Sequence, residues 1–448
     1  MVTRRSLIGG SAALAATLAL PLPAAAAPAF VRREGTRLML GERPYRFAGA
    51  NIWYGAWLGA SARFGNRARL IRELDALVAT GVTNLRILAS AEDSPLKNSV
   101  KPAFRTAARD SADPALLDGL DFCLAEMARR GMKAVLYLTN FWEWSGGMMT
   151  YLSYVNGGRF VDANDPAHPW PEFPNATAQF YANPKAVSLY HDWVRRIVGR
   201  TNHVTGTAYR DDPTIMAWQL ANEPRPAGDI ATATPLLPAY YAWIRGTAKL
   251  IKSLDSNHLV STGSEGLKGS VESAGIFRTA HAIPEIDYLT AHIWPLNWSW
   301  VDARDIPGTH AGATARVAEY LQQHQALARE IGKPLVIEEF GYPRDGGGYD
   351  PEASTRFKDL YYQQIYDAVI NSARTGGPIA GSNFWAWNGE GRAAHGDHRV
   401  KPGDTAWLGD PPHEPQGWYG VFDSDASTRA VIKAHAEALA SVGEPVAI

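Results

Sequence analysis

Two stretches of the sequence end an apolar run in a carboxylate. In IMAWQLANEPRP, which begins at Ile215, Glu223 directly precedes Pro224, a residue that cannot continue a central strand. In PLVIEEFG, Glu338 and Glu339 stand near the end of the run. A buried carboxylate is costly unless it is paired or hydrogen-bonded, so several carboxylates in such positions indicate a site that uses shifted pKa values.

Two carboxyl groups on opposite sides of a pocket are suited to the hydrolysis of glycosidic bonds. One group gives its proton to the leaving oxygen, and the other attacks the anomeric carbon as a carboxylate. Retaining enzymes hold the groups about 5–5.5 Å apart, and inverting enzymes roughly 6.5–9.5 Å apart. Neighbours on a strand point to opposite faces, so at most one of Glu338 and Glu339 should fully face the pocket, and strand parity alone does not choose between them.

Eight apolar runs with strand character alternate with amphipathic helical stretches. The runs cover 46–52, 82–88, 133–140, 215–223, 258–266, 286–294, 334–341 and 381–388. Such alternation predicts a parallel sheet covered on both faces, and eight repeats predict a single (β/α)8 TIM barrel over residues 27–448. A doubly wound open sheet is the alternative, but no Gly-rich phosphate loop follows the first run. Residues 30–47 predict a small N-terminal hairpin that covers the bottom of the barrel.

Polar residues collect where the predicted strands end. In a barrel, these C-terminal ends surround the mouth, where long loops gather and chemistry is expected. The segments after the third, sixth and eighth strands are long and rich in aromatic residues, which argues against disorder. The polar residues expected at the mouth are Arg86, Asn140, Asn222, Glu223, Glu265, His292, Glu338, Glu339, Asn388 and Glu390.

Several of these motifs resemble those of glycoside hydrolase family 5, a group of (β/α)8 retaining glycosidases. WQLANEPR resembles the family's Asn-Glu-Pro motif, and VIEEFG resembles its nucleophile strand, where the glutamate stands directly before an aromatic residue and Gly. The resemblance implies that Glu223 is the acid/base and that Glu339, not Glu338, is the nucleophile. It extends over nearly the whole chain after the N-terminal leader.

The same resemblance implies a set of substrate-binding residues. TNLRI places Arg86 near the nucleophile, and Asn222 would contact the 2-hydroxyl of the sugar. His292 matches the histidine at the end of the sixth strand. FWAW resembles the motif whose first Trp forms the floor of the −1 sugar site, which implies Trp385.

One motif departs from the family pattern. The family usually has His-x-Tyr on the sixth strand, whereas this chain has His292 followed two residues later by Trp294, whose indole N–H can donate but not accept. Either Arg86 and His292 alone then adjust the pKa of Glu339, or another tyrosine reaches the nucleophile instead. Trp142 and Trp144 are either sugar platforms or loop core, and we favour Trp142 for the site because it directly follows the third strand. Glu265 is expected at the edge of the site.

Within the family, four stretches most resemble the β-mannanase subfamily: GANIWYGAWLG, LTNFWEWSGGM, GTAYRDDPTIMAWQLANEPRP and STGSEG. This resemblance implies a secreted endo-β-1,4-mannanase that cleaves mannan or manno-oligosaccharides by double displacement, without a cofactor or metal. An exo-β-mannosidase and a β-1,4-glucanase on the same scaffold are the alternatives. A non-catalytic polysaccharide-binding barrel is a more distant one.

Composition limits the remaining possibilities. The net charge of −1 gives no indication of nucleic-acid or membrane binding, and 15 Trp residues favour flat apolar platforms of the kind that sugar rings stack on. Cys123 is the single cysteine, so no intrachain disulfide is possible, and its apolar helical context predicts burial. His395 and His398 are expected to be loop residues and not metal ligands. We expect a monomer.

The N-terminus has the pattern of an export signal. Arg4 and Arg5 precede an apolar Ala/Leu stretch and the small residues Ala24 to Ala26. This order of a charged region, an apolar region and a cleavage site predicts a signal peptide over 1–26, and the Arg pair resembles a twin-arginine signal. The mature protein is therefore predicted to be periplasmic or extracellular.

Overall fold

The computed structural model describes residues 29–105 and 111–443. The predicted signal peptide, residues 1–26, lies outside these ranges. Within them, no helix combines the length and the apolar character needed to cross a membrane.

Eight parallel strands form the central sheet. They are β4 (Phe47–Asn51), β5 (Asn84–Leu88), β6 (Lys133–Tyr137), β7 (Ile215–Gln219), β8 (Leu259–Ser261), β9 (Leu289–Ile293), β10 (Leu335–Phe340) and β11 (Ile379–Phe384). Strands adjacent in this order pair along the sheet from β4 to β8 and from β9 to β11, and β11 pairs with β4. Between β8 and β9, Asp287 N donates to Val260 O (2.7 Å) and His292 N to Glu265 O (3.0 Å). The barrel prediction is confirmed, and the open-sheet alternative is wrong.

Each strand is shorter than the apolar run predicted for it, and all of them except β5 end before the run does. The run predicted over 215–223, for example, ends as a strand at Gln219. Asn222 and Glu223 then follow in irregular backbone at the mouth. The sequence pattern reports burial, and the mouth of this barrel is buried beyond the ends of its strands.

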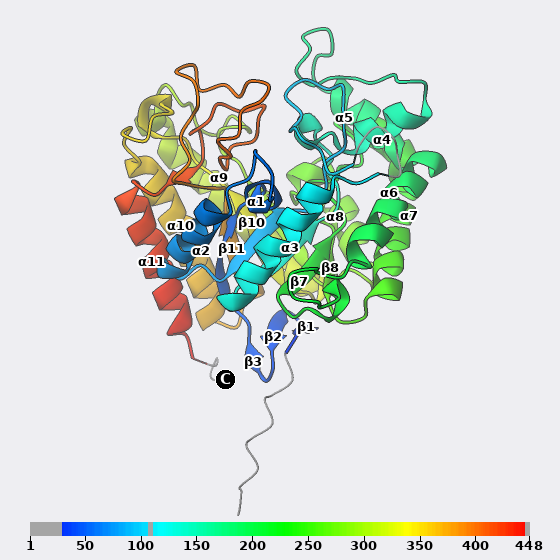
Figure 1. The fold of residues 1–448 in the computed structure, drawn as a ribbon. Helices are drawn as coiled ribbons and strands as arrows, with labels where there is room; N and C mark the ends of the chain where they lie inside the picture. The colour runs from blue at the N-terminus through cyan, green and yellow to red at the C-terminus, as the bar shows by residue number, and fades with distance from the viewer. Residues whose placement is uncertain (1–28, 106–110, 444–448) are drawn as a thin grey trace, which may run out of the picture.

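Helices surround the sheet, as Figure 1 shows. They are α1 (Gly55–Gly59), α2 (Arg67–Ala79), α3 (Pro114–Arg129), α6 (Pro184–Val198), α7 (Ile230–Leu254), α8 (Ala274–His281), α9 (Ile306–Ile331), α10 (Arg356–Arg374) and α11 (Ala426–Ala440). Helix α3 begins where the sequence directs it: Asp113 accepts hydrogen bonds from the backbone of Ala115 and Leu116, and Pro114 fills the first position. Gly119 lets α3 approach α1, since a Cβ there would lie 1.9 Å from Ala56 O.

The N-terminal segment covers the end of the barrel opposite the long loops (Figure 1). Strands β1 (Val31–Glu34), β2 (Arg37–Leu40) and β3 (Arg43–Pro44) form an antiparallel sheet. Val31 and Leu38 pack with barrel residues such as Met216, Leu259 and Val336 in a second apolar cluster. The predicted hairpin is confirmed, with a short third strand added to it.

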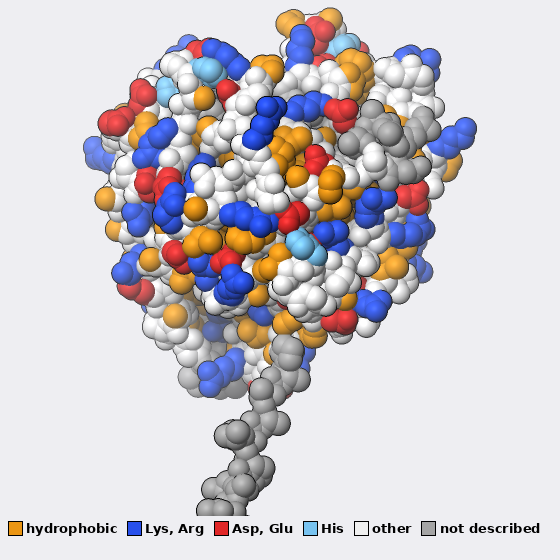
Figure 2. Space-filling model, in the orientation of Figure 1, with side chains coloured by type: hydrophobic (Ala, Val, Ile, Leu, Met, Phe, Trp, Pro, Cys, Tyr) orange, Lys and Arg blue, Asp and Glu red, His pale blue; other side chains and the backbone are white. Residues whose placement is uncertain are grey.

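The long connections lie at the C-terminal face. The β6–α6 connection contains η1 (Glu143–Ser145), α4 (Gly147–Val155), α5 (Glu172–Thr177) and η2 (Ala178–Phe180), and the connection after β11 contains the paired strands β12 (Trp387–Gly389) and β13 (Val421–Phe422). Shorter connections carry η3 (Tyr209–Asp211), η4 (Lys268–Ser270) and η5 (Asp345–Gly347). On the face drawn in Figure 2, acidic and basic side chains are interspersed, as the small net charge suggests. Cys123 is buried, and burial raises the pKa of its thiol to about 12.

Candidate active site

Glu223 occupies a strained backbone position at the mouth. Its φ angle is 49°, in the left-handed region that non-glycine residues seldom adopt, and its backbone N–H donates to Gly263 O (2.9 Å). Its carboxylate accepts two side-chain hydrogen bonds, from His292 Nδ1 to Oε1 (2.6 Å) and from Trp142 Nε1 to Oε2 (2.6 Å). Strain that the surroundings hold in place in this way is typical of a functional position.

Glu339 reaches the mouth through an irregularity in β10. The register between β10 and β9 shifts between Ile337 and Glu339, so Glu339 pairs with His292. Glu338 and Glu339 are both buried, but Glu339 lines the hollow at the mouth, whereas Glu338 accepts from Gln219 Nε2. The choice of Glu339 over Glu338 for the site agrees with this placement, and the bulge explains why strict strand alternation could not make that choice.

Arg86, on β5, is fully buried and holds several of these groups in place. Its Nη1 donates to Glu339 Oε1 and to Asn51 Oδ1 (3.2 Å), its Nε to Gln219 Oε1 (2.8 Å), and its Nη2 to Asn222 Oδ1 (2.8 Å). The sequence analysis found Arg86 and Asn222 but missed Asn51 and Gln219. A polar residue within an otherwise apolar strand was the available signal for Gln219.

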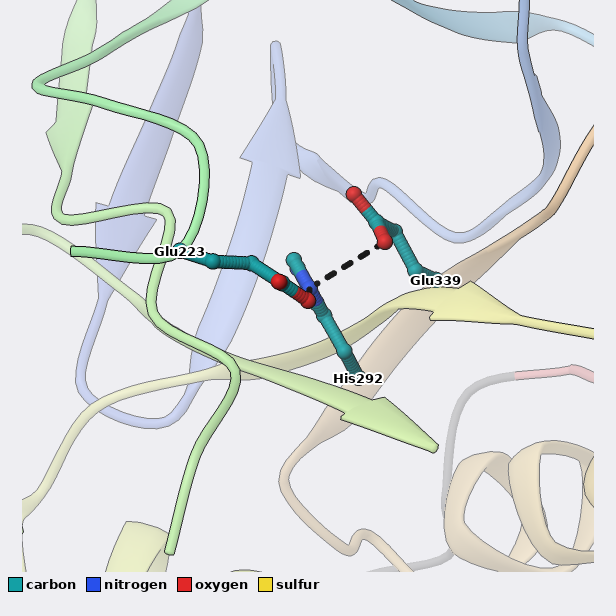
Figure 3. A group of neighbouring side chains, drawn as sticks. All are labelled: Glu223, His292 and Glu339. Carbon is teal, nitrogen blue, oxygen red and sulfur yellow. Dashed lines mark hydrogen bonds and ion pairs between the residues drawn. The ribbon is translucent and has the colours of Figure 1, made fainter. Parts of the chain in front are cut away.

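His292 lies between the two catalytic candidates, as Figure 3 shows. Its Nδ1 is 2.6 Å from Glu223 Oε1 and 3.3 Å from Glu339 Oε2, and its Nε2 is 3.8 Å from Glu338 Oε2. One oxygen of Glu223, one of Glu339 and a ring nitrogen of His292 lie within 4.8 Å of one another. The two carboxylates therefore approach each other closely, nearer to the short spacing of retaining glycosidases than to the longer inverting one.

Burial and charge act in opposite directions on this group. Burial alone would lower the pKa of His292, but the charge of Glu339 and the hydrogen bond to Glu223 raise it to about 9. Burial would raise the pKa of Glu223, and the hydrogen bond from His292 lowers it. Burial raises the pKa of Glu339, against the lowering effect of His292 and Arg86. Without substrate, the proton between His292 and Glu223 therefore resides on His292.

The predicted aromatic residues surround the carboxylates. Trp385 contacts Trp294 edge-on, with ring centroids 6.0 Å apart, and Trp294 in turn packs against Tyr419 (4.9 Å). Among the described residues, no tyrosine hydroxyl is hydrogen-bonded to Glu339, and of the two alternatives the contacts of Arg86 and His292 with Glu339 are the ones present. Trp142 was predicted as a platform for a sugar ring. Its indole N–H instead donates directly to the carboxylate of Glu223.

A hollow of 880 Å³ opens over the carboxylates. Six of the eight predicted site residues line it, and the other two, Arg86 and His292, lie buried against the lining carboxylates. The six are Trp142, Asn222, Glu223, Trp294, Glu339 and Trp385. The lining also includes Glu143 and Glu414, which the sequence analysis missed because they stand within loops and not at strand ends. Burial raises the pKa of Glu143 to about 7 and that of Glu414 well above its usual range.

The wall beside Glu223 is built around Arg225. Its guanidinium pairs with Glu265 and lies over the rings of Trp142 (5.0 Å) and Trp170 (5.9 Å). Glu265 also accepts from Trp298 Nε1 (3.1 Å) and lines the hollow, in agreement with its predicted place at the edge of the site.

Four other residues lie outside the hollow. Asn388 and Glu390, predicted at the mouth, are held elsewhere: Asn388 Oδ1 accepts from Gly409 N (2.7 Å), and Glu390 pairs with Arg72 (2.7 Å). Their prediction at the mouth was wrong because β11 ends at Phe384, and the chain continues into the separate β12–β13 pair. His395 pairs with Asp404 (3.0 Å) and His398 with Asp350 (3.3 Å) in the loops, as expected of loop residues.

The described residues contain one group with the spacing of metal ligands, and it is Glu223, His292 and Glu339. Oxygens of both carboxylates already accept hydrogen bonds from Arg86, His292 and Trp142. These donors fit an ionised carboxylate pair better than a cation site.

Fold and site together define a (β/α)8 barrel with a paired-carboxylate centre at its C-terminal face. The family model "GH family 5 beta-mannosidase-like" matches residues 28–444. The chain therefore belongs to the β-mannosidase-like group within glycoside hydrolase family 5.

Known relatives cover most of the chain. A putative mannan endo-1,4-beta-mannosidase 9 of Oryza sativa subsp. japonica is 30% identical over 90% of this chain and 88% of its own length. Mannan endo-1,4-beta-mannosidase 1 of Arabidopsis thaliana is 29% identical over 80% and 81%. The structure of a glycoside hydrolase family 5 mannosidase from Rhizomucor miehei with mannosyl-fructose is 34% identical, with a TM-score of 0.84 over 93% of this chain and 98% of that one.

Proposed function

We propose that the protein hydrolyses β-1,4-mannosidic linkages of mannan or manno-oligosaccharides by double displacement. The observation that carries the proposal is the Glu223–His292–Glu339 group, whose reacting atoms lie within 4.8 Å of one another. The names of the curated relatives support mannan as the substrate and internal cleavage as the mode.

In this proposal, Glu339 attacks the anomeric carbon while Glu223 protonates the departing oxygen. Arg86 orients Glu339 through its direct contact with Oε1. The proton reaches Glu223 Oε1 from His292 Nδ1 across the 2.6 Å hydrogen bond. In the second step, Glu223 takes a proton from a water molecule. The water oxygen attacks the anomeric carbon and breaks its bond to Glu339, and the proton returns to the hydrogen bond between His292 and Glu223.

The test is hydrolysis of linear β-1,4-mannan by the wild type and by Glu339→Ala. We expect turnover by the wild type and a loss of roughly 10⁴-fold or more in the variant, because no covalent intermediate can form. Arg278→Ala removes an exposed ion pair of the outer helix α8, lines no part of the hollow, and serves as the control with unchanged activity. Wild-type rates in Glu339→Ala would refute the assignment, and β-1,4-glucan as the better substrate would favour the glucanase alternative.

An exo-β-mannosidase is the second candidate, and one observation favours it. Trp53 packs against Trp144 of the loop after β6 (5.6 Å) and against Trp407 of the loop after β12 (6.3 Å). These two loops also place Glu143 and Glu414 in the hollow, on the side where Trp144 contacts Trp385 (6.4 Å). Loops joined in this way support a closed end next to the −1 sugar site.

The products of mannohexaose separate the two modes. Internal cleavage would release mannobiose to mannotetraose from the start and reduce the viscosity of mannan at few new ends. A closed end would release one small product continuously, with little change in viscosity. Glu414→Ala and Glu143→Ala should then shift the exo pattern toward longer products if these loops set the closed end.

A further inference from the structure

A second hollow of 390 Å³ adjoins the first and shares Lys268 and Glu272 with it. Trp300 lines it from the β9–α9 connection, and Tyr320 from α9. The side chains at its rim are exposed and polar, and they belong to one face of α9: Arg316, Glu319 and Gln323. An aromatic wall beside hydrogen-bonding groups is a surface on which a sugar can bind.

Four residues separate the two hollows and are called the partition below: Lys268, Glu272, Trp298 and Trp300. Lys268 pairs with Glu272, and its Nζ lies 5.7 Å from the ring of Trp298 and 5.8 Å from that of Trp300. The two indoles contact each other edge-on at 4.8 Å. Trp298 lines the catalytic hollow and Trp300 the second one, so a single aromatic pair extends across both.

Backbone strain is concentrated at the same partition. Val271 (φ 45°), Glu272 (φ 60°) and Ser299 (φ 55°) are in the left-handed region, which is rare for non-glycine residues and least favourable for a β-branched one. Glu223 has the same kind of backbone. Such strain persists where the surroundings impose it, and it clusters at ligand clamps and active sites.

The position of this partition relative to Glu223 indicates what would cross it. Glu265 and Trp298 line the catalytic hollow together with Glu223, and Trp298 Nε1 donates to Glu265 Oε1 (3.1 Å). From Trp298, contacts with Lys268 and Trp300 lead into the second hollow, so a leaving-group chain that follows this wall would reach Trp300. The direction follows from the roles of Glu223 and Glu339, so it rests on the proposed function.

We propose that the second hollow is a distal saccharide subsite, which binds the leaving-group end of a β-1,4-linked mannan chain against Trp300. Arg316, Glu319 and Gln323 supply hydrogen bonds to its hydroxyl groups. Short substrates end before this subsite, and long ones occupy it.

The experiment compares kcat/KM on mannobiose and on mannohexaose for Trp300→Ala, Trp300→Phe and Arg316→Ala. We expect Trp300→Ala to lose roughly 3- to 10-fold on mannohexaose, mainly through KM, with mannobiose unchanged. Trp300→Phe should restore most of the loss, and Arg316→Ala should show a smaller loss of the same kind. Phe160→Ala removes an exposed aromatic residue that lines neither hollow and serves as the control.

Calorimetric titration of Glu339→Ala with mannohexaose, with and without Trp300→Ala, checks binding without turnover. Weaker binding of the double variant is expected. Equal losses on both substrates would show a structural effect on the catalytic hollow, and unchanged values in all variants would show that no sugar binds there. Either result overturns the proposal while the wild-type hydrolysis of mannan stands, whereas an inactive wild type would instead contradict the proposed function.

Discussion

Glu223 and Glu339 are both buried and share His292, so their position and not their burial separates their roles. Glu339 is bound to the permanently charged Arg86, which favours an ionised nucleophile. Glu223 shares its proton only with His292, which can supply it. The proton in the 2.6 Å hydrogen bond between His292 and Glu223 is therefore available to Glu223 as the acid. Glu339, the nucleophile, stays paired with the positive charge of Arg86.

Azide can separate these roles chemically. With an aryl β-mannoside whose leaving group needs no protonation, Glu223→Ala should still form the glycosyl-enzyme, and azide should release β-mannosyl azide. Glu339→Ala leaves space for azide to attack directly, which should give the inverted α-mannosyl azide. The anomeric configuration is read by NMR, and the reverse pattern would exchange the two assignments.

The pH dependence of kcat/KM should report the His292–Glu223 proton. The pKa of His292 is raised to about 9, so the proton is bound below that pH and lost above it. Because the general acid needs this proton, activity should fall as the pH rises through about 9. His292→Asn should lower kcat/KM and move the basic limb, whereas Arg278→Ala, on an outer helix, should leave it in place. A basic limb that His292→Asn does not alter would contradict this route.

At the scale of elements, buried polar contacts fix the barrel's outer helices to its strands. Asp121 of α3 accepts from Arg200 Nε (2.8 Å), Tyr209 Oη (2.5 Å) and His203 Nδ1 (2.6 Å), in the connection that leads into β7. Burial would raise the pKa of Asp121, but the hydrogen bonds from Arg200 and Tyr209 lower it. The strand that delivers Glu223 is thus tied to α3.

Asp121→Ala should reduce the free energy of unfolding by about 3 kcal/mol, because it removes the buried acceptor of a partly buried guanidinium and of the Tyr209 hydroxyl. Because the pKa of this aspartate is lowered, the stabilisation is present above its unfolded-state pKa and disappears as the pH falls through the folded value. Urea unfolding at pH 7 and at acidic pH measures both effects. Glu330→Ala, which breaks an exposed pair with Arg278, is the control and should leave the midpoint unchanged. Equal midpoints for Asp121→Ala and wild type would contradict the prediction.

At the scale of the molecule, the few exposed large apolar side chains are informative. Among the described residues they are Val78, Phe160, Trp170, Val204, Ile230 and Leu360. Trp170 and Ile230 line the catalytic hollow, so two of the six are accounted for by the site. The rest are scattered along the chain, which favours a monomer over a homo-oligomer with an apolar interface.

Light scattering after size exclusion should therefore give the mass of one chain at micromolar concentration. Addition of manno-oligosaccharide should not change that mass, because Trp170 and Ile230 line the hollow in which we propose that the substrate binds. A concentration-dependent dimer would contradict the monomer prediction.

The sequence by itself determined the barrel and most of its chemical residues. Eight apolar runs report burial directly, and polar residues within or just after them, such as Arg86 in β5 and Asn222 and Glu223 after β7, are the ones that meet at the site. The motif resemblance added the choice of Glu339. The N-terminal leader stays a prediction.

Only the tertiary structure decided how distant loops and strands meet. The bulge in β10 brings Glu339 beside His292, and strand alternation cannot predict a bulge. Glu143, Glu414 and the second hollow at Trp300 depend on loops whose paths are set by packing against one another, such as Trp53 between Trp144 and Trp407. A loop residue has no periodic pattern to indicate its neighbours, so its function becomes visible only when the chain is folded.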